Sequence, residues 1–184
     1  MAEQRRELLI GCGRRRQRHI QVNGIRDWSN LTTLDKEPSH EPDIVADLEV
    51  LPFAWSASDY WDEIHAYEVL EHTGAQGDAA FFFAQFEEFW RILKPGGVLC
   101  GTCPGFGSPW VWGDPSHKRA LQMESFAFLE QVRYGEVGYT PMSDFRSIYR
   151  GDFVVEARQE TPAGPHNPVL VFVLTAVKPA RLAG

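Results

Sequence analysis

Apolar runs of strand length recur along the first 105 residues, and each ends at a glycine, an acid or a proline. Short runs bounded in this way are typical of buried strands in an α/β sheet. They predict five strands, over residues 8–10, 31–35, 43–47, 62–68 and 98–104. Two later runs, 152–160 and 169–178, have no long crossover between them, so they predict an antiparallel hairpin at the sheet edge.

A helical periodicity replaces the strand pattern over residues 78–93. Asp78 is a suitable N-cap, and the Lys-Pro-Gly-Gly sequence at 94–97 predicts an abrupt end. The apolar positions that share one face are Phe82, Phe86, Phe89 and Leu93, flanked by Phe83 and Trp90. An aromatic stripe of this kind predicts core packing, not a cofactor-binding surface.

The connecting segments are less regular. Residues 14–30 contain an arginine cluster and several turn residues, so the first crossover is predicted to be irregular, with a short helical piece around 25–31. Residues 105–122 are rich in Gly, Pro and Trp and predict a long loop above the strand ends. Residues 123–133 predict a short helix.

The length of 184 residues, 43% of them hydrophobic, suits one α/β domain over residues 1–184. We divide it into an N-terminal half, about 1–105, a lid loop, about 104–122, and the edge hairpin, about 152–178. No apolar stretch has the length of a membrane span, and the odd number of cysteines argues against a disulfide scaffold. We therefore expect a cytoplasmic protein without membrane insertion.

The net charge of −7 is unevenly distributed, because residues 1–26 carry seven Arg against two Glu while the rest is strongly acidic. This balance disfavours general nucleic-acid binding. The cluster at Arg14–His19 is either a solvated loop or a contact for phosphate or carboxylate groups.

The first and second predicted strands end in residues that suit a nucleotide. Gly11 and Gly13 let the backbone approach a ligand closely, and Asp35 follows about twenty residues later. A glycine turn followed by such a carboxylate is how a doubly wound sheet holds an adenosine ribose. Arg16 occupies the last glycine position of the G-x-G-x-x-G fingerprint, which disfavours a nicotinamide enzyme.

Five segments together resemble one family. They are Leu-Leu-Ile-Gly-Cys-Gly at 8–13, Asp35, Asp-Ile-Val-Ala-Asp-Leu-Glu-Val-Leu-Pro-Phe at 43–53, Tyr-Glu-Val-Leu-Glu-His at 67–72 and Arg-Ile-Leu-Lys-Pro-Gly-Gly at 91–97. In this order and spacing they resemble the class I S-adenosylmethionine (SAM)-dependent methyltransferases, and most closely the small, single-domain, methyltransferase type 11-like branch. The resemblance implies a Rossmann-like seven-stranded sheet of order 3-2-1-4-5-7-6, with strand 7 antiparallel.

The resemblance also implies SAM as cofactor and a set of residues that bind it: Gly11, Cys12, Gly13, Asp35, Lys36, Asp47, Leu48, Glu68 and Val69. The glycine turn would lie against the methionine part and Asp35 would hold the ribose hydroxyls. Lys36, Asp47 and Leu48 would surround the adenine, and Glu68 and Val69 would face the amino acid moiety.

The turn departs from the family at Arg15, where a third small residue is usual. We therefore hypothesise that a guanidinium of Arg14–Arg16 pairs with the cofactor carboxylate.

Methyl transfer from a sulfonium requires alignment and exclusion of water, and a base only if the acceptor loses a proton. Asp114–Arg119 resembles an Asp-Pro-Thr-His-x-Arg element of relatives in this branch. His117 is either a general base oriented by Asp114, or both residues pin the loop through backbone hydrogen bonds. Trp110 and Trp112 either line an acceptor pocket or bury the loop.

Three further residues have side chains that could bind a substrate or a metal ion or take part in redox chemistry. His72 is a candidate for the substrate site or a packing residue at a helix start. Cys100 and Cys103 have C-x-x-C spacing, but a strand would direct their side chains to opposite faces, which argues against a redox or metal role. No metal site is therefore expected.

The sequence after the fourth predicted strand lacks the Asn/Asp-Pro-Pro-Tyr element of enzymes that methylate amino groups of nucleic acids. This favours a small-molecule, sugar or lipid-linked acceptor. The alternative is a methyltransferase-like binding or scaffold domain without turnover.

Overall fold

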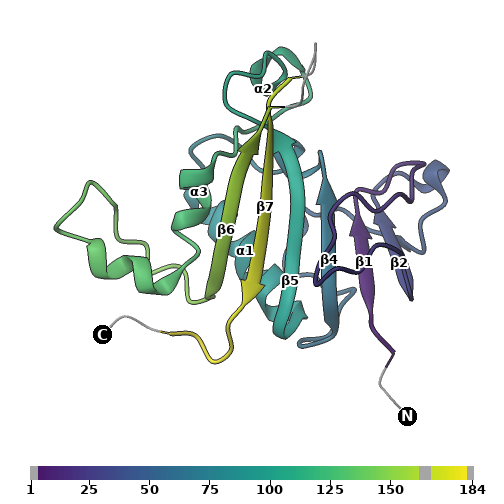
Figure 1. Cartoon of the computed structure of the whole chain (residues 1–184), viewed down its shortest axis with the longest axis horizontal. Helices are drawn as coiled ribbons and strands as arrows, with labels where there is room; N and C mark the ends of the chain where they lie inside the picture. The colour runs from purple at the N-terminus through teal and green to yellow at the C-terminus, as the bar shows by residue number, and fades with distance from the viewer. Residues whose placement is uncertain (1–3, 162–166, 182–184) are drawn as a thin grey trace.

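A single seven-stranded sheet organises the computed structural model, which describes residues 4–161 and 167–181 (Figure 1). The strand order is β3-β2-β1-β4-β5-β7-β6, and β7 is antiparallel to both of its neighbours. The strands are β1 Glu7–Ile10, β2 Leu31–Asp35, β3 Ile44–Val45, β4 Trp61–Tyr67, β5 Leu93–Pro104, β6 Phe153–Glu160 and β7 Val169–Ala176. The predicted fold class, including the strand order and the terminal hairpin, is confirmed.

Short helical segments connect these strands. The α-helices are α1 Ala79–Ile92, α2 Trp110–Gly113 and α3 Met123–Ala127, and the 3₁₀ segments are Pro38–His40, Leu70–His72 and Gln131–Glu136. Within the described residues, no helix combines the length and apolar character needed to cross a membrane.

The helix α1 supplies the aromatic side of the core. Asp78 Oδ1 accepts a hydrogen bond from the Phe81 amide at 3.0 Å, as expected of an N-cap. The predicted core role is confirmed, although Phe82 is only half-buried. Leu93 belongs to β5, because the helix ends at Ile92. The buried positions of the helix are Phe83, Gln85, Phe86, Phe89 and Ile92.

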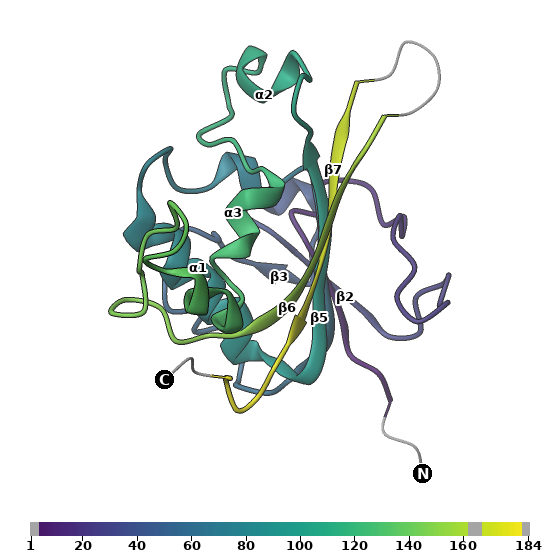
Figure 2. The same cartoon turned by 60° about the vertical axis from the view of Figure 1, so that its left-hand side comes forward.

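The two faces of the sheet are covered differently (Figure 2). The helices α1 and α3 lie on one face, whereas the irregular crossover between β1 and β2 lies on the other. The predicted irregularity is confirmed, but the helical piece expected around 25–31 is wrong. Asn23 and Gly24 adopt φ of 52° and 76°, and Val22 bridges to Ile25, so the chain makes a tight turn there instead.

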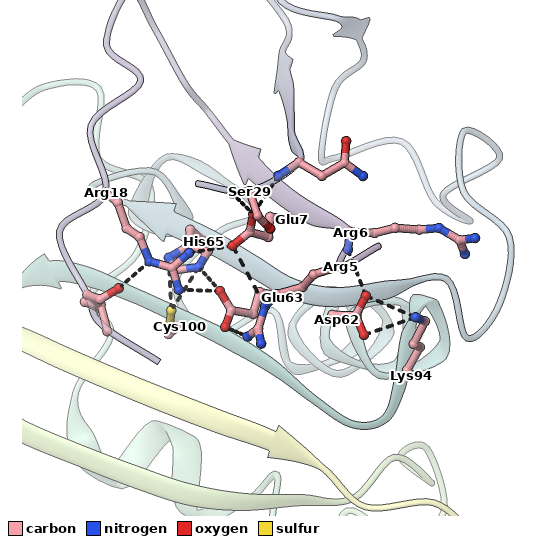
Figure 3. A network of polar contacts seen from close by, with 12 residues as sticks. Arg5, Arg6, Glu7, Arg18, Ser29, Asp62, Glu63, His65, Lys94 and Cys100 are labelled. Atoms are coloured by element: carbon pink, nitrogen blue, oxygen red, sulfur yellow. Dashed lines mark hydrogen bonds and ion pairs between the residues drawn. The ribbon is translucent and has the colours of Figure 1, made fainter. Parts of the chain in front are cut away.

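A buried polar network, in place of a helix, holds this crossover to the sheet (Figure 3). Arg18 donates to Glu7 of β1 at 2.7 Å and also to Glu63 of β4, and both carboxylates are fully buried. Glu7 accepts further hydrogen bonds from the Ser29 and Asn30 amides, at 2.7 and 3.0 Å. Charged and hydrogen-bonded groups thus fix a segment that has few apolar residues to bury.

Two other predicted elements differ in extent. The strand expected over 98–104 begins at Leu93, directly after α1. The helix expected over 123–133 breaks after Ala127, because the Gln131 amide donates to Asp152 Oδ1 at 3.0 Å instead of continuing the helical pattern. The turn of the predicted hairpin, 162–166, lies outside the described residues.

The cysteines are free and buried. Cys103 belongs to the main core, and Cys100 packs with Val22 and Val98 in a smaller cluster beneath the crossover. The two side chains therefore face opposite sides of the sheet, as predicted.

Candidate functional site

The candidate site lies at the carboxyl ends of the parallel strands, where the chain order reverses between β1 and β4. In sheets of this type, ligands bind at such switch points. A cavity of about 660 Å³ opens there, and every predicted cofactor-binding residue except Cys12 lines it. The lining residues that the sequence did not single out for the cofactor are Leu34, His40, Ala46, Glu49, His72, Thr73, Pro115, Ser116 and Lys118.

Asp35 ends β2 with its carboxylate at the cavity wall. Its Oδ2 accepts from the Gly13 amide at 2.8 Å, and its Oδ1 accepts from the Glu37 amide at 2.9 Å. Burial raises the pKa of Asp35, but these amide hydrogen bonds outweigh it and lower the pKa below its usual value. Asp35 is therefore ionised at neutral pH and oriented as an acceptor for hydroxyl groups.

The glycine turn gives the cavity its close backbone wall. Gly11 has φ of 59°, and a Cβ at this position would lie 2.3 Å from Val69 Cγ2. Only glycine fits both the conformation and the space. Glu68, directly after β4, also has positive φ, 51°, which is uncommon for a residue other than glycine and occurs often at functional sites.

The far end of the cavity is closed by contacts that the sequence did not indicate. Lys118 Nζ lies 2.6 Å from Glu49 Oε2, and Glu49 Oε1 accepts from the Gly74 amide at 2.8 Å. These contacts join the loop after α2 to the segments that follow β3 and β4. No local pattern predicts them, since the partners are 69 and 25 residues apart.

The arginine cluster supports the turn from outside. Arg16 donates to the carbonyls of Gly13 at 2.7 Å and His40 at 2.9 Å, so its guanidinium is engaged with backbone. Arg14 and Arg15 are exposed, and none of the three side chains lines the cavity. Pairing of Arg14 or Arg15 with a cofactor carboxylate stays a prediction.

A second cavity of about 600 Å³ adjoins the first, because Glu68 and His72 line both. It lies beneath the loop that contains α2, and Trp110, Asp114 and His117 are also part of its lining. Trp112 lines neither cavity and is 64% exposed. The structure thus brings His72, Trp110, Asp114 and His117 together and leaves Trp112 apart.

The contacts of Asp114 and His117 fit both roles considered for them. Asp114 Oδ1 accepts from the Ser116 amide and hydroxyl at 2.8 and 2.6 Å, which pins the loop. His117 Nδ1 lies 3.3 Å from the Val111 carbonyl, and its Nε2 lies 3.8 Å from Asp114 Oδ2. A role for His117 as a base stays a prediction.

The end of this loop is anchored in the core by Arg119, which is buried. Its guanidinium donates to the Leu70 carbonyl at 3.0 Å, Thr73 Oγ1 at 3.0 Å and Gln85 Oε1 at 2.6 Å. Burial lowers the pKa of Arg119 to about 10, so it stays charged at neutral pH. The Arg that closes the Asp114–Arg119 element was the available signal for this anchor.

Glu71 lines the second cavity and is buried, and sequence reasoning gave it no role. Its side chain is buried, and neither oxygen has a hydrogen-bond partner among the described residues. Burial raises the pKa of Glu71 to about 8, and the neighbouring Glu68 carboxylate acts in the same direction.

Sequence comparison finds no matching family model and no matching curated protein. Solved structures do match. A SAM-dependent methyltransferase from Archaeoglobus fulgidus has a TM-score of 0.58 at 14% identity, over 94% of this chain and 86% of its own. The N-methyltransferase NodS from Bradyrhizobium japonicum WM9 has a TM-score of 0.54 at 15% identity, over 95% and 87% of the two chains. A SAM-dependent methyltransferase from Methanosarcina mazei has a TM-score of 0.53 at 15% identity, over 96% of this chain and 94% of its own. Together with the strand order, these matches show that this chain has the fold of the class I SAM-dependent methyltransferases.

Proposed function

We propose that this protein is a SAM-dependent methyltransferase that acts on a small-molecule, sugar or lipid-linked acceptor. One observation carries the proposal: the cavity at the switch point is lined by Asp35, Asp47 and Glu68, each at or beyond the carboxyl end of a different strand. The fold supports the proposal. Because a fold alone does not define an activity, the residues of the site must supply the chemistry.

The residues present fit this cofactor. SAM has hydrogen-bond donors on its ribose, adenine and amino groups, and the three acids offer acceptors along the length of the cavity. Gly11, which lines the cavity, must be glycine because a Cβ there would collide with Val69, and Val69 is itself part of the cavity wall. When bound, SAM supplies a methyl group on a positively charged sulfur.

The second cavity provides a place for the acceptor. It meets the first cavity at Glu68 and His72. A nucleophile held in the second cavity would therefore face the part of the bound cofactor that lies beside these two residues. Trp110 offers an apolar wall, and His117 is positioned to take a proton from a hydroxyl acceptor.

Calorimetric titration with SAM and with S-adenosylhomocysteine tests the proposal. Asp35→Asn should weaken binding by about 2 kcal/mol, or roughly thirtyfold in Kd, because it removes a charged acceptor from the ribose hydroxyls. Asp43→Asn is the matched control: Asp43 accepts from the Thr33 amide and hydroxyl at 2.8 and 2.7 Å but does not line the cavity. Its affinity for SAM should equal that of the unaltered protein.

The same titration, followed by a transfer assay, distinguishes an active methyltransferase from a binding or scaffold domain without turnover. Absence of binding at millimolar SAM would refute the proposed methyltransferase activity. Binding that Asp35→Asn weakens, followed by transfer of labelled methyl groups in a screen of hydroxyl, amine and carbon acceptors, would support it. Tight binding with no transfer to any acceptor class would favour the scaffold.

A further inference from the structure

Three side chains with metal-binding atoms converge at the junction of the two cavities. Glu71 and His72 end the 3₁₀ segment after β4, and His117 descends from the loop after α2. One ligand atom from each residue lies within 4.8 Å of the others. The two imidazole rings are in edge contact, with centroids 4.6 Å apart. Residues from two separate segments therefore meet at one point.

Hydrogen bonds fix the orientation of His72. Its Nδ1 lies 3.3 Å from the Ser116 carbonyl and 3.2 Å from Ser116 Oγ. A carbonyl can only accept, and the Ser116 hydroxyl already donates its proton to Asp114, so Nδ1 must carry the hydrogen. The neutral ring then has its lone pair on Nε2, the atom that can ligate a metal.

His117 is oriented in the same way. Its Nδ1 lies 3.3 Å from the Val111 carbonyl, which again places the hydrogen on Nδ1 and the lone pair on Nε2. Metal-ligating histidines usually donate their other ring N–H to a carbonyl or carboxylate. The Asp114 carboxylate, 3.8 Å from Nε2, adds negative charge beside the same atom.

Glu71 supplies an independent indication of a ligand. Its side chain is 2% exposed, and both oxygens are buried without a hydrogen-bond partner among the residues that the structure describes. A buried carboxyl group in this condition either keeps its proton or needs a positive charge beside it to ionise. The nearby buried cation, Arg119, interacts with Glu71 through its charge, but its hydrogen bonds go to Leu70, Thr73 and Gln85.

We propose that Glu71, His72 and His117 bind a divalent first-row transition-metal ion. Two neutral imidazoles and one carboxylate form a donor set that suits Zn²⁺, Mn²⁺ or Fe²⁺, and three protein ligands leave coordination positions open. All three residues line the second cavity, so the open positions face the space where an acceptor would lie.

The acceptor class follows from this placement, and this part rests on the proposed function. An open position on such an ion would be filled by an oxygen or nitrogen donor of the substrate. His117 would then be a ligand, and it would act as a base only in the metal-free protein. Because the cluster borders the first cavity through His72, a bound donor atom would lie close to the cofactor. The site therefore favours acceptors with a hydroxyl or carboxylate oxygen over purely apolar ones.

Co²⁺ is a suitable probe, because its visible absorption reports coordination by protein ligands directly. The full chain, purified without a histidine tag and stripped with a chelator, should bind about one Co²⁺ per chain. Glu71→Gln and His117→Gln should each weaken binding by at least about tenfold. His19→Gln, which alters an exposed histidine outside the cluster, should leave the titration unchanged.

Two results would overturn the inference: no Co²⁺ absorption at millimolar metal, or equal affinity in Glu71→Gln, His117→Gln and His19→Gln. Thermal melting of each variant shows whether it is folded, and either of the two cluster variants suffices for the test. SAM titrations on the metal-free protein are read separately. Co²⁺ binding without SAM binding would support the metal site and refute the proposed function, and the converse would refute only the metal site.

Discussion

The histidine in the network beneath the crossover makes the stability of this protein sensitive to acid. His65 of β4 is fully buried. Its Nε2 lies 2.9 Å from Glu63 Oε2 and its Nδ1 lies 2.6 Å from the Tyr67 hydroxyl. Because Glu63 is an acceptor, Nε2 carries the hydrogen, and Nδ1 accepts from Tyr67. The network thus holds a neutral imidazole, and Arg18, Cys100 and Trp28 are among its other neighbours.

The size of this loss of stability follows from the lowered pKa of His65. Burial, and then the charge of Arg18, lower the pKa of His65 from 6.5 to about 3. Between these values the unfolded chain binds a proton that the folded chain does not, so stability falls as the pH falls. Taking the two values, the free energy of unfolding should drop by about 2 kcal/mol between pH 7 and pH 5 through this group alone.

Urea denaturation at a series of pH values measures this difference. His65→Gln keeps a donor for Glu63 and an acceptor for Tyr67 but does not titrate, so its free energy of unfolding should fall by about 2 kcal/mol less between pH 7 and pH 5. His19→Gln controls for loss of an exposed histidine and should follow the unaltered protein. Parallel curves for the unaltered protein and His65→Gln would show that the reasoning is wrong.

Two further predictions concern the network and the glycine turn. Arg18→Met removes one of the two guanidinium groups beside the buried carboxylates of Glu7 and Glu63. Because Arg5 still pairs with both, the loss should be about 2 to 3 kcal/mol in urea denaturation, less than for a fully unpaired buried charge; a loss below about 1 kcal/mol would contradict it. Gly11→Ala forces a Cβ against Val69 at the cavity wall and should weaken SAM binding by at least about tenfold in calorimetry. An unchanged Kd would show that the turn does not touch the cofactor.

The strands and the strand-end residues were predictable because their signals are local. Most of the parallel strands contain an apolar run, and the residue at the carboxyl end of each falls on the same edge of the sheet as its neighbours. Asp35 and Glu68 therefore reach one cavity although 33 positions separate them. Knowledge of the strand order, which the family resemblance supplied, was enough to place them.

The elements that the sequence did not reveal depend on contacts between distant residues. The crossover is held by Arg18 and Glu63, which are 45 residues apart, and no periodicity in 14–30 could indicate that pairing. The short helix α3 ends early because the Gln131 amide meets Asp152, 21 residues away. In both places a polar group of one segment satisfies another, and such pairs leave no mark on the hydrophobic pattern.

The loop after α2 determines how the two cavities are related. Its consecutive residues His117, Lys118 and Arg119 reach the second cavity, the rim of the first cavity and the core, respectively. The amides of Lys118 and Arg119 both donate to the Glu71 carbonyl, at 2.8 and 3.2 Å. A shift of this loop would therefore displace the rim of the first cavity and the imidazole of the second together. If the protein is the methyltransferase proposed above, in-line transfer would depend on the mutual placement of cofactor and acceptor, and the buried contacts of Arg119 would position both without touching either.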